Sequence, residues 1–98
     1  MTDTEPTLAD VRRAIDEIDI RMVALLAARE VQVRRAATLK TDEQGVRAPA
    51  RVEQVIAKVR TLAGESGASP DVVERVYRAM IGAFIDLELA EHRGMTGG

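Results

Sequence analysis

The chain has 98 residues, the length of one small domain, and its 46% of apolar residues can form a core, which excludes wholesale disorder. A net charge of −2 argues against a general nucleic-acid binder, and the lack of cysteine excludes disulfides, zinc–thiolate sites and thiol catalysis. His92 is the only histidine. One chain therefore cannot supply a multi-histidine metal site, and we expect no metal.

No apolar run follows a basic N-terminus, and no stretch approaches the ~20 apolar residues that span a bilayer. We therefore expect a cytoplasmic protein without a signal peptide or a membrane partner. The composition is poor in aromatic residues and suits a helix bundle better than strands. The predicted fold class is all-α, with three helices in one domain over residues 7–92 and loose tails over residues 1–6 and 93–98.

The first predicted helix begins at Thr7, where Thr7 and Asp10 form a capping-box pattern. Nothing breaks the helix before residues 40–45, which gives about 33 residues, or ~50 Å. Apolar residues recur along it with alternating spacings of three and four, which is typical of one helix face. This apolar seam comprises Leu8, Val11, Ile15, Ile18, Met22 and Leu25.

Two further helices follow a predicted loop over residues 41–48. Pro49 fits the first turn of the second helix, and Gly64 and Gly67 end it. The third helix begins with a cap, a first-turn proline and a first-turn acid, which are Ser69, Pro70 and Asp71. The predicted apolar faces are Val52, Val55, Ile56, Val59, Leu62 and Ala63, and then Val73, Val76, Tyr77, Met80, Ile81, Phe84 and Leu87.

The first helix is too long for its own chain. A compact domain of this size has a radius of gyration of about 13 Å, so a helix of ~50 Å extends beyond two shorter helices. Its apolar seam needs a partner, and we predict a homodimer in which the long helices pair. A coiled-coil homodimer is the alternative, although the heptad pattern fails after Leu25, whereas zippers usually sustain at least ~3 heptads.

Basic residues continue the face of the first helix beyond its apolar seam. Arg29 follows Leu25 by four residues and Lys40 follows Arg29 by eleven, which places both cations on one face, ~16 Å apart. Either both reach solvent or pair with acids, or they hold one small dianion. Arg12 lies ~26 Å from Arg29, too far to share a small ligand within one subunit. In an antiparallel dimer, Arg12 could approach the Arg29 end of the partner helix.

Arg51 and Glu88 have unusual positions on the other two helices. A cation in a first turn opposes the helix dipole, so Arg51 suggests an anion bound there. Glu88 continues the face of Tyr77, Ile81 and Phe84, and a buried carboxylate needs a partner or a proton. It is either an ion-pair partner or a protonated donor in a pocket. Since the sequence has no glycine-rich phosphate loop, we expect no cofactor.

This ordered set of residues resembles the all-helical, type II chorismate mutases. The resemblance covers roughly residues 8–92. It implies an intertwined homodimer with two active sites, each of which takes Arg12 from the partner subunit. The matching pattern is Leu8-x-x-x-Arg12-x-x-Ile15-Asp16-x-Ile18-Asp19, then Leu25-Leu26-Ala27-x-Arg29, Lys40, Arg51, Gly67-x-Ser69-Pro70 and Glu88.

By this resemblance, Arg29 and Arg51 bind the substrate carboxylates, and Lys40 and Glu88 contact the ether oxygen of the enolpyruvyl group. The implied reaction is the pericyclic rearrangement of chorismate to prephenate in aromatic amino acid biosynthesis, which uses no cofactor. Negative charge builds on the ether oxygen as the C–O bond breaks. Lys40, and Glu88 if protonated, would stabilise that charge, while the arginines orient the substrate.

Three positions depart from the commonest mutase pattern. Ala48 replaces a frequent acid, Val52 replaces a glutamate that binds the ring hydroxyl, and Phe84 replaces a small polar residue. With Pro49, these apolar changes resemble the isochorismate pyruvate lyase branch, which makes salicylate and pyruvate, although that branch usually has glutamine where this chain has Glu88. The lyase reaction is the alternative function. A non-catalytic helical dimerisation module is the alternative from another class.

Overall fold

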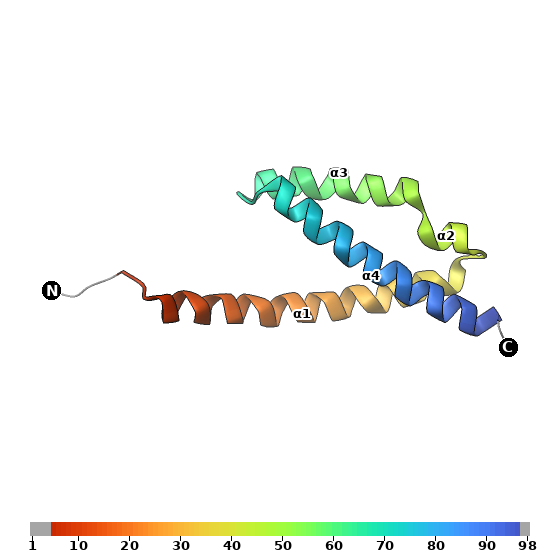
Figure 1. Cartoon of the computed structure of the whole chain (residues 1–98), viewed down its shortest axis with the longest axis horizontal. Coiled ribbons are helices and arrows are strands. Elements are labelled where there is room, and N and C mark those ends of the chain that lie inside the picture. Colours follow the sequence, from red (N-terminus) through yellow and green to blue (C-terminus); the bar gives the residue numbers. More distant parts are fainter. Residues whose placement is uncertain (1–4, 97–98) are drawn as a thin grey trace. The chain divides into compact units, whose positions relative to one another are not determined.

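The structure, a computed structural model, describes residues 5–96 (Figure 1). These residues form α1 (Leu8–Leu39), α2 (Glu43–Arg47), α3 (Pro49–Glu65) and α4 (Pro70–Thr96), and they contain no strand, so the all-α class is confirmed. The chain divides into two compact units, up to Gln32 and from Val33 onward, and α1 runs through both. None of the helices in the described part combines the length and hydropathy that crossing a bilayer requires.

The start of α1 is closed by the predicted capping box. The backbone N–H of Asp10 donates to Thr7 Oγ1 across 3.1 Å, and the Thr7 N–H donates back to Asp10 Oδ2 across 2.9 Å. The hydrogen bond from the Thr7 backbone N–H to the Asp10 carboxylate, followed by the effect of the Thr7 hydroxyl, lowers the pKa of that carboxyl. Two backbone N–H groups that a helix start leaves without a partner are thus satisfied, and α1 extends over 32 residues.

The apolar seam of α1 is open to solvent in a single chain. Its six residues, Leu8, Val11, Ile15, Ile18, Met22 and Leu25, are between 44% and 70% exposed. Within α1, all of which is described, Ala37 is the one buried residue. These six apolar side chains lie at helical spacing and form one continuous exposed face. Such an exposed apolar face is unusual for a helix of a monomeric protein.

The segment between α1 and α3 contains a one-turn helix, α2, where the sequence predicts a loop. Asp42 is its N-cap, and its side chain accepts the Gly45 N–H across 2.8 Å. Val46 is only 2% exposed and anchors the turn in the core. A helix of five residues has little stability of its own, so the cap and the buried valine explain why it forms.

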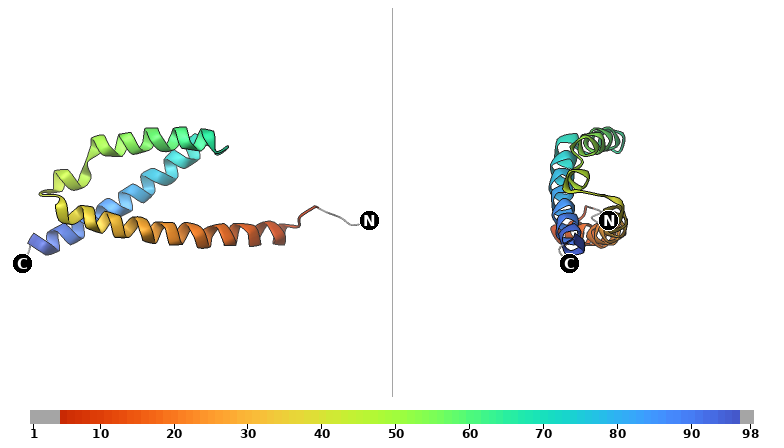
Figure 2. Two further views of the ribbon diagram at one scale, coloured as in Figure 1. Left: turned by 180° about the vertical axis from the view of Figure 1, so that it is seen from behind. Right: turned by 90° about the vertical axis from the view of Figure 1, so that its right-hand side faces the viewer.

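The helices α3 and α4 form a hairpin in the second unit (Figure 2). The predicted first-turn prolines Pro49 and Pro70 begin them, and Gly67, with φ of 79°, lies in the turn between them. The core lies mainly between these helices and α2, and the buried apolar residues of the second unit are Ala37, Val46, Ile56, Val59, Ala63, Ile81 and Leu89.

Two details of the hairpin differ from the sequence prediction. Leu62 and Val76, assigned to the apolar faces, are 47% and 50% exposed in a single chain. The helix α4 also includes residues 93–96, which the sequence assigns to a tail. Residues 1–4 and 97–98 of the predicted tails lie outside the described residues.

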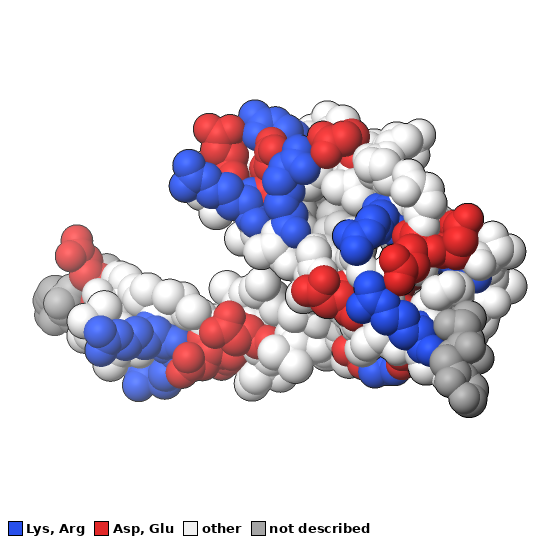
Figure 3. Space-filling view, turned by 45° about the vertical axis from the view of Figure 1, so that its right-hand side comes forward, with Lys and Arg blue, Asp and Glu red and all other residues white. Residues whose placement is uncertain are grey.

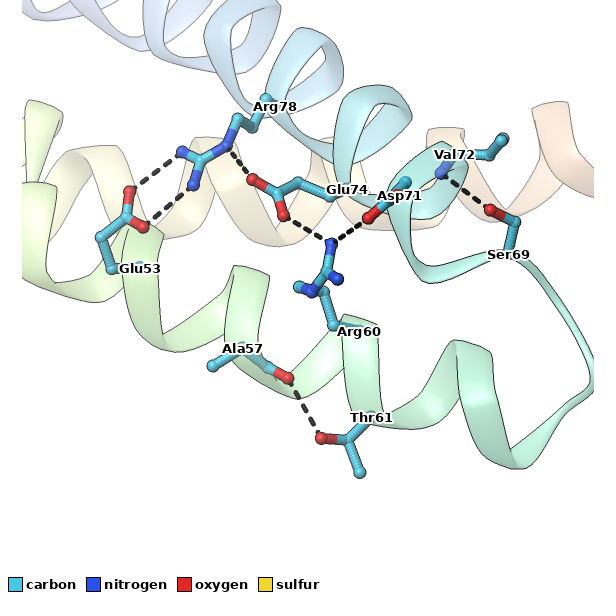
Figure 4. Close-up of polar contacts among 9 residues, drawn as sticks. All are labelled: Glu53, Ala57, Arg60, Thr61, Ser69, Asp71, Val72, Glu74 and Arg78. Atoms are coloured by element: carbon cyan, nitrogen blue, oxygen red, sulfur yellow. Dashed lines mark hydrogen bonds and ion pairs between the residues drawn. The ribbon is translucent and has the colours of Figure 1, made fainter.

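Ion pairs connect α3 and α4 on their outer surface, where acidic and basic side chains are interspersed (Figure 3). Arg78 donates from Nη1 and Nη2 to the two carboxylate oxygens of Glu53, at 2.9 and 3.0 Å, and from Nε to Glu74 at 2.7 Å (Figure 4). Arg60 donates to Glu74 at 2.8 Å and to Asp71 at 3.0 Å. These five residues form one network, which lowers the pKa of Glu53 and Glu74 through the hydrogen bonds from Arg78.

Candidate active site

The pairing of Lys40 with Glu88 is the centre of the candidate site. Lys40 directly follows the last residue of α1, and its Nζ donates to Oε2 of Glu88 across 2.7 Å. The Glu88 side chain is 8% exposed and that of Lys40 is 26% exposed. A carboxylate buried to this degree requires a partner, and Lys40 supplies the positive charge. The ion-pair interpretation of Glu88 therefore describes its contact in this structure.

The same contact leaves Lys40 able to bind a further group. A lysine ammonium has three N–H donors, and Glu88 accepts one of them. The other two can serve an oxygen of a bound molecule while the ion pair persists. Lys40 and Glu88 thus place a cation and a carboxylate side by side at the partly buried edge of the second unit.

The end of α4 that carries Glu88 also contacts α1 and α2. Glu91 forms an ion pair with Arg34 of α1, and Arg93 Nε donates to Glu43 Oε1 of α2 across 3.0 Å. Residues 40–42, here called the connector, join α1 to α2. The C-terminal end of α4 contacts the connector through Glu88, α1 before it through Glu91, and α2 after it through Arg93. The connector that bears Lys40 is therefore held in place by its own contact and by contacts of the two helices that flank it.

Gly45 of α2 lies close to Lys40. A Cβ atom placed on Gly45 would be 3.7 Å from Cβ and 3.9 Å from Cγ of Lys40. The same Cβ would be 3.3 Å from Oδ1 of Asp42, the oxygen that caps α2. The α2 backbone thus approaches the aliphatic part of Lys40 to within the space of about one methyl group.

The other predicted site residues of the second unit lie on α3 and α4. Arg51 is exposed in the first turn of α3, and Val52 beside it is half-buried. Phe84 is half-buried and precedes Glu88 by four residues, so both lie on one face of α4. Ala48, between α2 and α3, has a φ of 38°, a left-handed conformation that costs a residue with a Cβ roughly 1 kcal/mol or more.

Arg12 and Arg29 belong to the first unit. Both lie on α1, where Arg12 is exposed and Arg29 is half-buried. Their separation of 17 residues on one continuous helix corresponds to ~26 Å, as the sequence predicts. The two arginines therefore cannot contact one small ligand within one subunit, and their roles remain predictions.

Sequence reasoning missed the residues that surround Lys40. Asp42 followed by Glu43 is a helix-start pattern that could have revealed α2, since aspartate is a preferred N-cap and an acid favours the first turn. The pairs of Glu91 with Arg34 and of Arg93 with Glu43 had no such signal, because their partners are far apart in the sequence.

Comparison with known proteins agrees with the residue pattern. The family model described as chorismate mutase type II matches residues 11–89. The chain is also similar to the isochorismate pyruvate lyase of Pseudomonas aeruginosa, with 32% identity over 90 residues that cover 92% of this chain and 89% of that protein. The chain therefore belongs to the type II chorismate mutase family and is an enzyme of that family, which confirms the resemblance seen in the sequence.

Proposed function

We propose that this enzyme converts chorismate into prephenate by a cofactor-free pericyclic rearrangement. The observation that carries the proposal is the ammonium of Lys40, which Glu88 holds across 2.7 Å in a partly buried position. A cation fixed before the reaction stabilises charge that develops in the transition state without solvent reorganisation. The description of the matching family supports the same reaction type.

The reaction breaks one C–O bond and forms one C–C bond in a single step, so it requires no nucleophile. The ether oxygen gains negative charge as its bond to the ring lengthens. In our proposal, one of the remaining N–H donors of Lys40 bonds this oxygen. Glu88 orients the ammonium, and in its protonated form it would donate a second hydrogen bond to the oxygen.

Arginines would bind the two carboxylates and hold the reacting carbons together. We propose Arg29 and Arg51 of one subunit for this role, with Arg12 supplied by the partner subunit. The exposed seam of α1 supports a homodimer, because six apolar residues at helical spacing remain between 44% and 70% exposed in a single chain. A second copy of α1 offers a matching apolar face of the same length.

A second candidate function is the elimination of pyruvate from isochorismate. It is supported by the similarity to the isochorismate pyruvate lyase of Pseudomonas aeruginosa. Val52 also stands where mutases often have a hydroxyl-binding glutamate, Ala48 where they often have an acid, and Phe84 where they often have a small polar residue, so this part of the chain is more apolar. The same Lys40 would stabilise the departing enolate oxygen, and one ring hydrogen must move to the methylene carbon, because pyruvate carries a methyl group.

Incubation of the purified enzyme with each substrate separates the two functions. Prephenate from chorismate at the higher kcat/KM would support the mutase. Salicylate and pyruvate in equal amounts from isochorismate, at the higher kcat/KM, would support the lyase. Lys40→Ala is the control in both assays. If neither substrate is consumed by a folded protein, the proposal is wrong and the dimerisation module becomes the better interpretation.

The proposed homodimer has its own test. Sedimentation at low micromolar concentration should give one species with twice the mass of the chain. Ile15→Glu places a charge in the middle of the seam and should yield monomer or unfolded chain, whereas Glu17→Gln, a change at another exposed position of α1, should leave the dimer unchanged. A folded monomer of the unaltered chain would contradict the dimer.

A further inference from the structure

The backbone conformation of Gly45 does not require a glycine. Its φ lies outside the left-handed region, and glycine in a helix costs about 1 kcal/mol relative to alanine. A Cβ there would lie 3.3 Å from Asp42 Oδ1, which is tight, and 3.7 Å from Lys40 Cβ, which is van der Waals contact, so a side chain larger than a methyl group has little room beside Lys40. Gly64 of α3 is the contrast, because a Cβ there meets nothing within 4 Å.

Three contacts hold α2 in this close position. The Asp42 carboxylate accepts the Gly45 N–H across 2.8 Å, and Val46 is inserted into the core at 2% exposure. Glu43 accepts from Arg93 of α4 across 3.0 Å, and Arg93 follows Glu88 by five residues on the same helix. The aliphatic part of Lys40 therefore has α2 beside it, while its ammonium is bonded to α4.

We propose that Gly45 and Asp42 are positioning residues for Lys40. The α2 backbone lies beside the stem of Lys40, where a branched side chain at Gly45 would press on that stem, and the Asp42 cap keeps α2 there. The ammonium at the end of the stem is bonded to Glu88. The effect on rate rests on the proposed role of Lys40, but the effect on the Lys40 side chain does not.

The lysine content of the chain allows a direct test. Only Lys40 and Lys58 are present, so 15N-lysine labelling gives two ammonium signals, and exposed Lys58 is an internal reference. Gly45→Val should shift or broaden the Lys40 signal, leave the Lys58 signal in place, and lower kcat by about 10- to 100-fold, because a misplacement of ~1 Å can cost about 100-fold. The KM should change far less. Gly64→Val makes the same substitution in open space and should alter none of these quantities.

Asp42 supplies a second pair of variants in case Gly45→Val does not fold. Asparagine caps a helix about as well as aspartate, whereas alanine does not. Asp42→Ala should therefore disturb the Lys40 signal, and Asp42→Asn should restore it. An undisturbed Lys40 signal in folded Gly45→Val, or equal signals in the two Asp42 variants, would overturn the proposal. A disturbed signal with unchanged kcat would retain the positioning but contradict the catalytic role of Lys40.

Discussion

Lys40 and Glu88 are 48 positions apart in the sequence, and in the fold their side chains meet across a 2.7 Å hydrogen bond. The contact joins the connector after α1 to the C-terminal half of α4. Experiments on either residue must therefore take account of the other, because a substitution of one changes the surroundings of its partner.

The ion pair should contribute to stability through its burial. Lys40→Met leaves the Glu88 carboxylate, 8% exposed, without its charge partner, and should lower the free energy of unfolding by about 3 kcal/mol. In a Glu88→Gln background the same substitution should cost much less, since no buried charge is left. Urea denaturation of the wild type, the two single variants and the double variant, all at the same protein concentration, measures the coupling energy between Lys40 and Glu88. Additive effects would mean that the pair is too hydrated to matter.

The charge of Glu88, the ion-pair partner of Lys40, should limit the rate. A carboxylate beside the ether oxygen opposes the negative charge that develops there, whereas an amide donates to it. Glu88→Gln should therefore be faster than wild type by about 10-fold, since one such donor contributes on the order of 100-fold when complete.

Turnover of the two proteins, measured side by side at one pH and one protein concentration, checks this prediction. Equal or lower turnover of Glu88→Gln would show that Glu88 acts only as the ion-pair partner of Lys40.

Lys40 and Arg51 should affect different kinetic constants. Lys40 faces charge that grows in the transition state, so Lys40→Ala should lower kcat by about 100- to 1,000-fold. Arg51, exposed in the first turn of α3, would face a carboxylate present throughout, so Arg51→Ala should mainly raise KM. Both are best measured in the Glu88→Gln background, which avoids the unpaired buried carboxylate. A larger kcat loss for Arg51→Ala would reverse the assigned roles.

Arg12 should act in the opposite subunit. It lies ~26 Å from Arg29 along α1, so one subunit cannot bring both to one substrate. Arg12→Ala and Lys40→Ala homodimers should both be nearly inactive. A heterodimer of the two has one site with both wild-type residues, so mixing should restore up to about half the activity per heterodimer. If differently tagged subunits are shown to exchange and no activity returns, the shared site is wrong.

The ion-pair network of α3 and α4 should add stability that depends on pH. Hydrogen bonds from Arg78 lower the folded-state pKa of Glu53 and Glu74 below 4.5. A lowered carboxyl pKa stabilises the fold above the unfolded-state value, and this contribution is lost as pH falls through the folded-state value.

Arg78→Gln should therefore destabilise the protein at pH ~7 and much less at pH ~3, and high salt should reduce the difference because the network is exposed. Thermal unfolding across this pH range measures the effect. Arg75→Gln, at an exposed arginine of the same helix, is the matched control. Equal, pH-independent effects of both substitutions would contradict a specific network.

Much of the fold follows from short-range features of the sequence. The Thr7–Asp10 capping box, the first-turn prolines Pro49 and Pro70, and the helical spacing of the α1 seam all appear in the structure where the sequence predicts them. Caps and helix faces depend on residues within about four positions of one another, so local reading is sufficient for them. The family could also be predicted from the sequence, because its pattern consists of particular residues at fixed spacings along the chain.

Only the tertiary structure decided the surroundings of Lys40. The sequence left Glu88 as either an ion-pair partner or a protonated donor, and it did not reveal α2 or the approach of Gly45 to the Lys40 stem. These contacts depend on how the connector folds back between α1 and α4. Contacts between segments that are distant in the sequence follow from loop closure and packing, which no local spacing encodes. For that reason, only the folded chain showed that Glu88 pairs with Lys40 and that α2 lies beside the Lys40 stem.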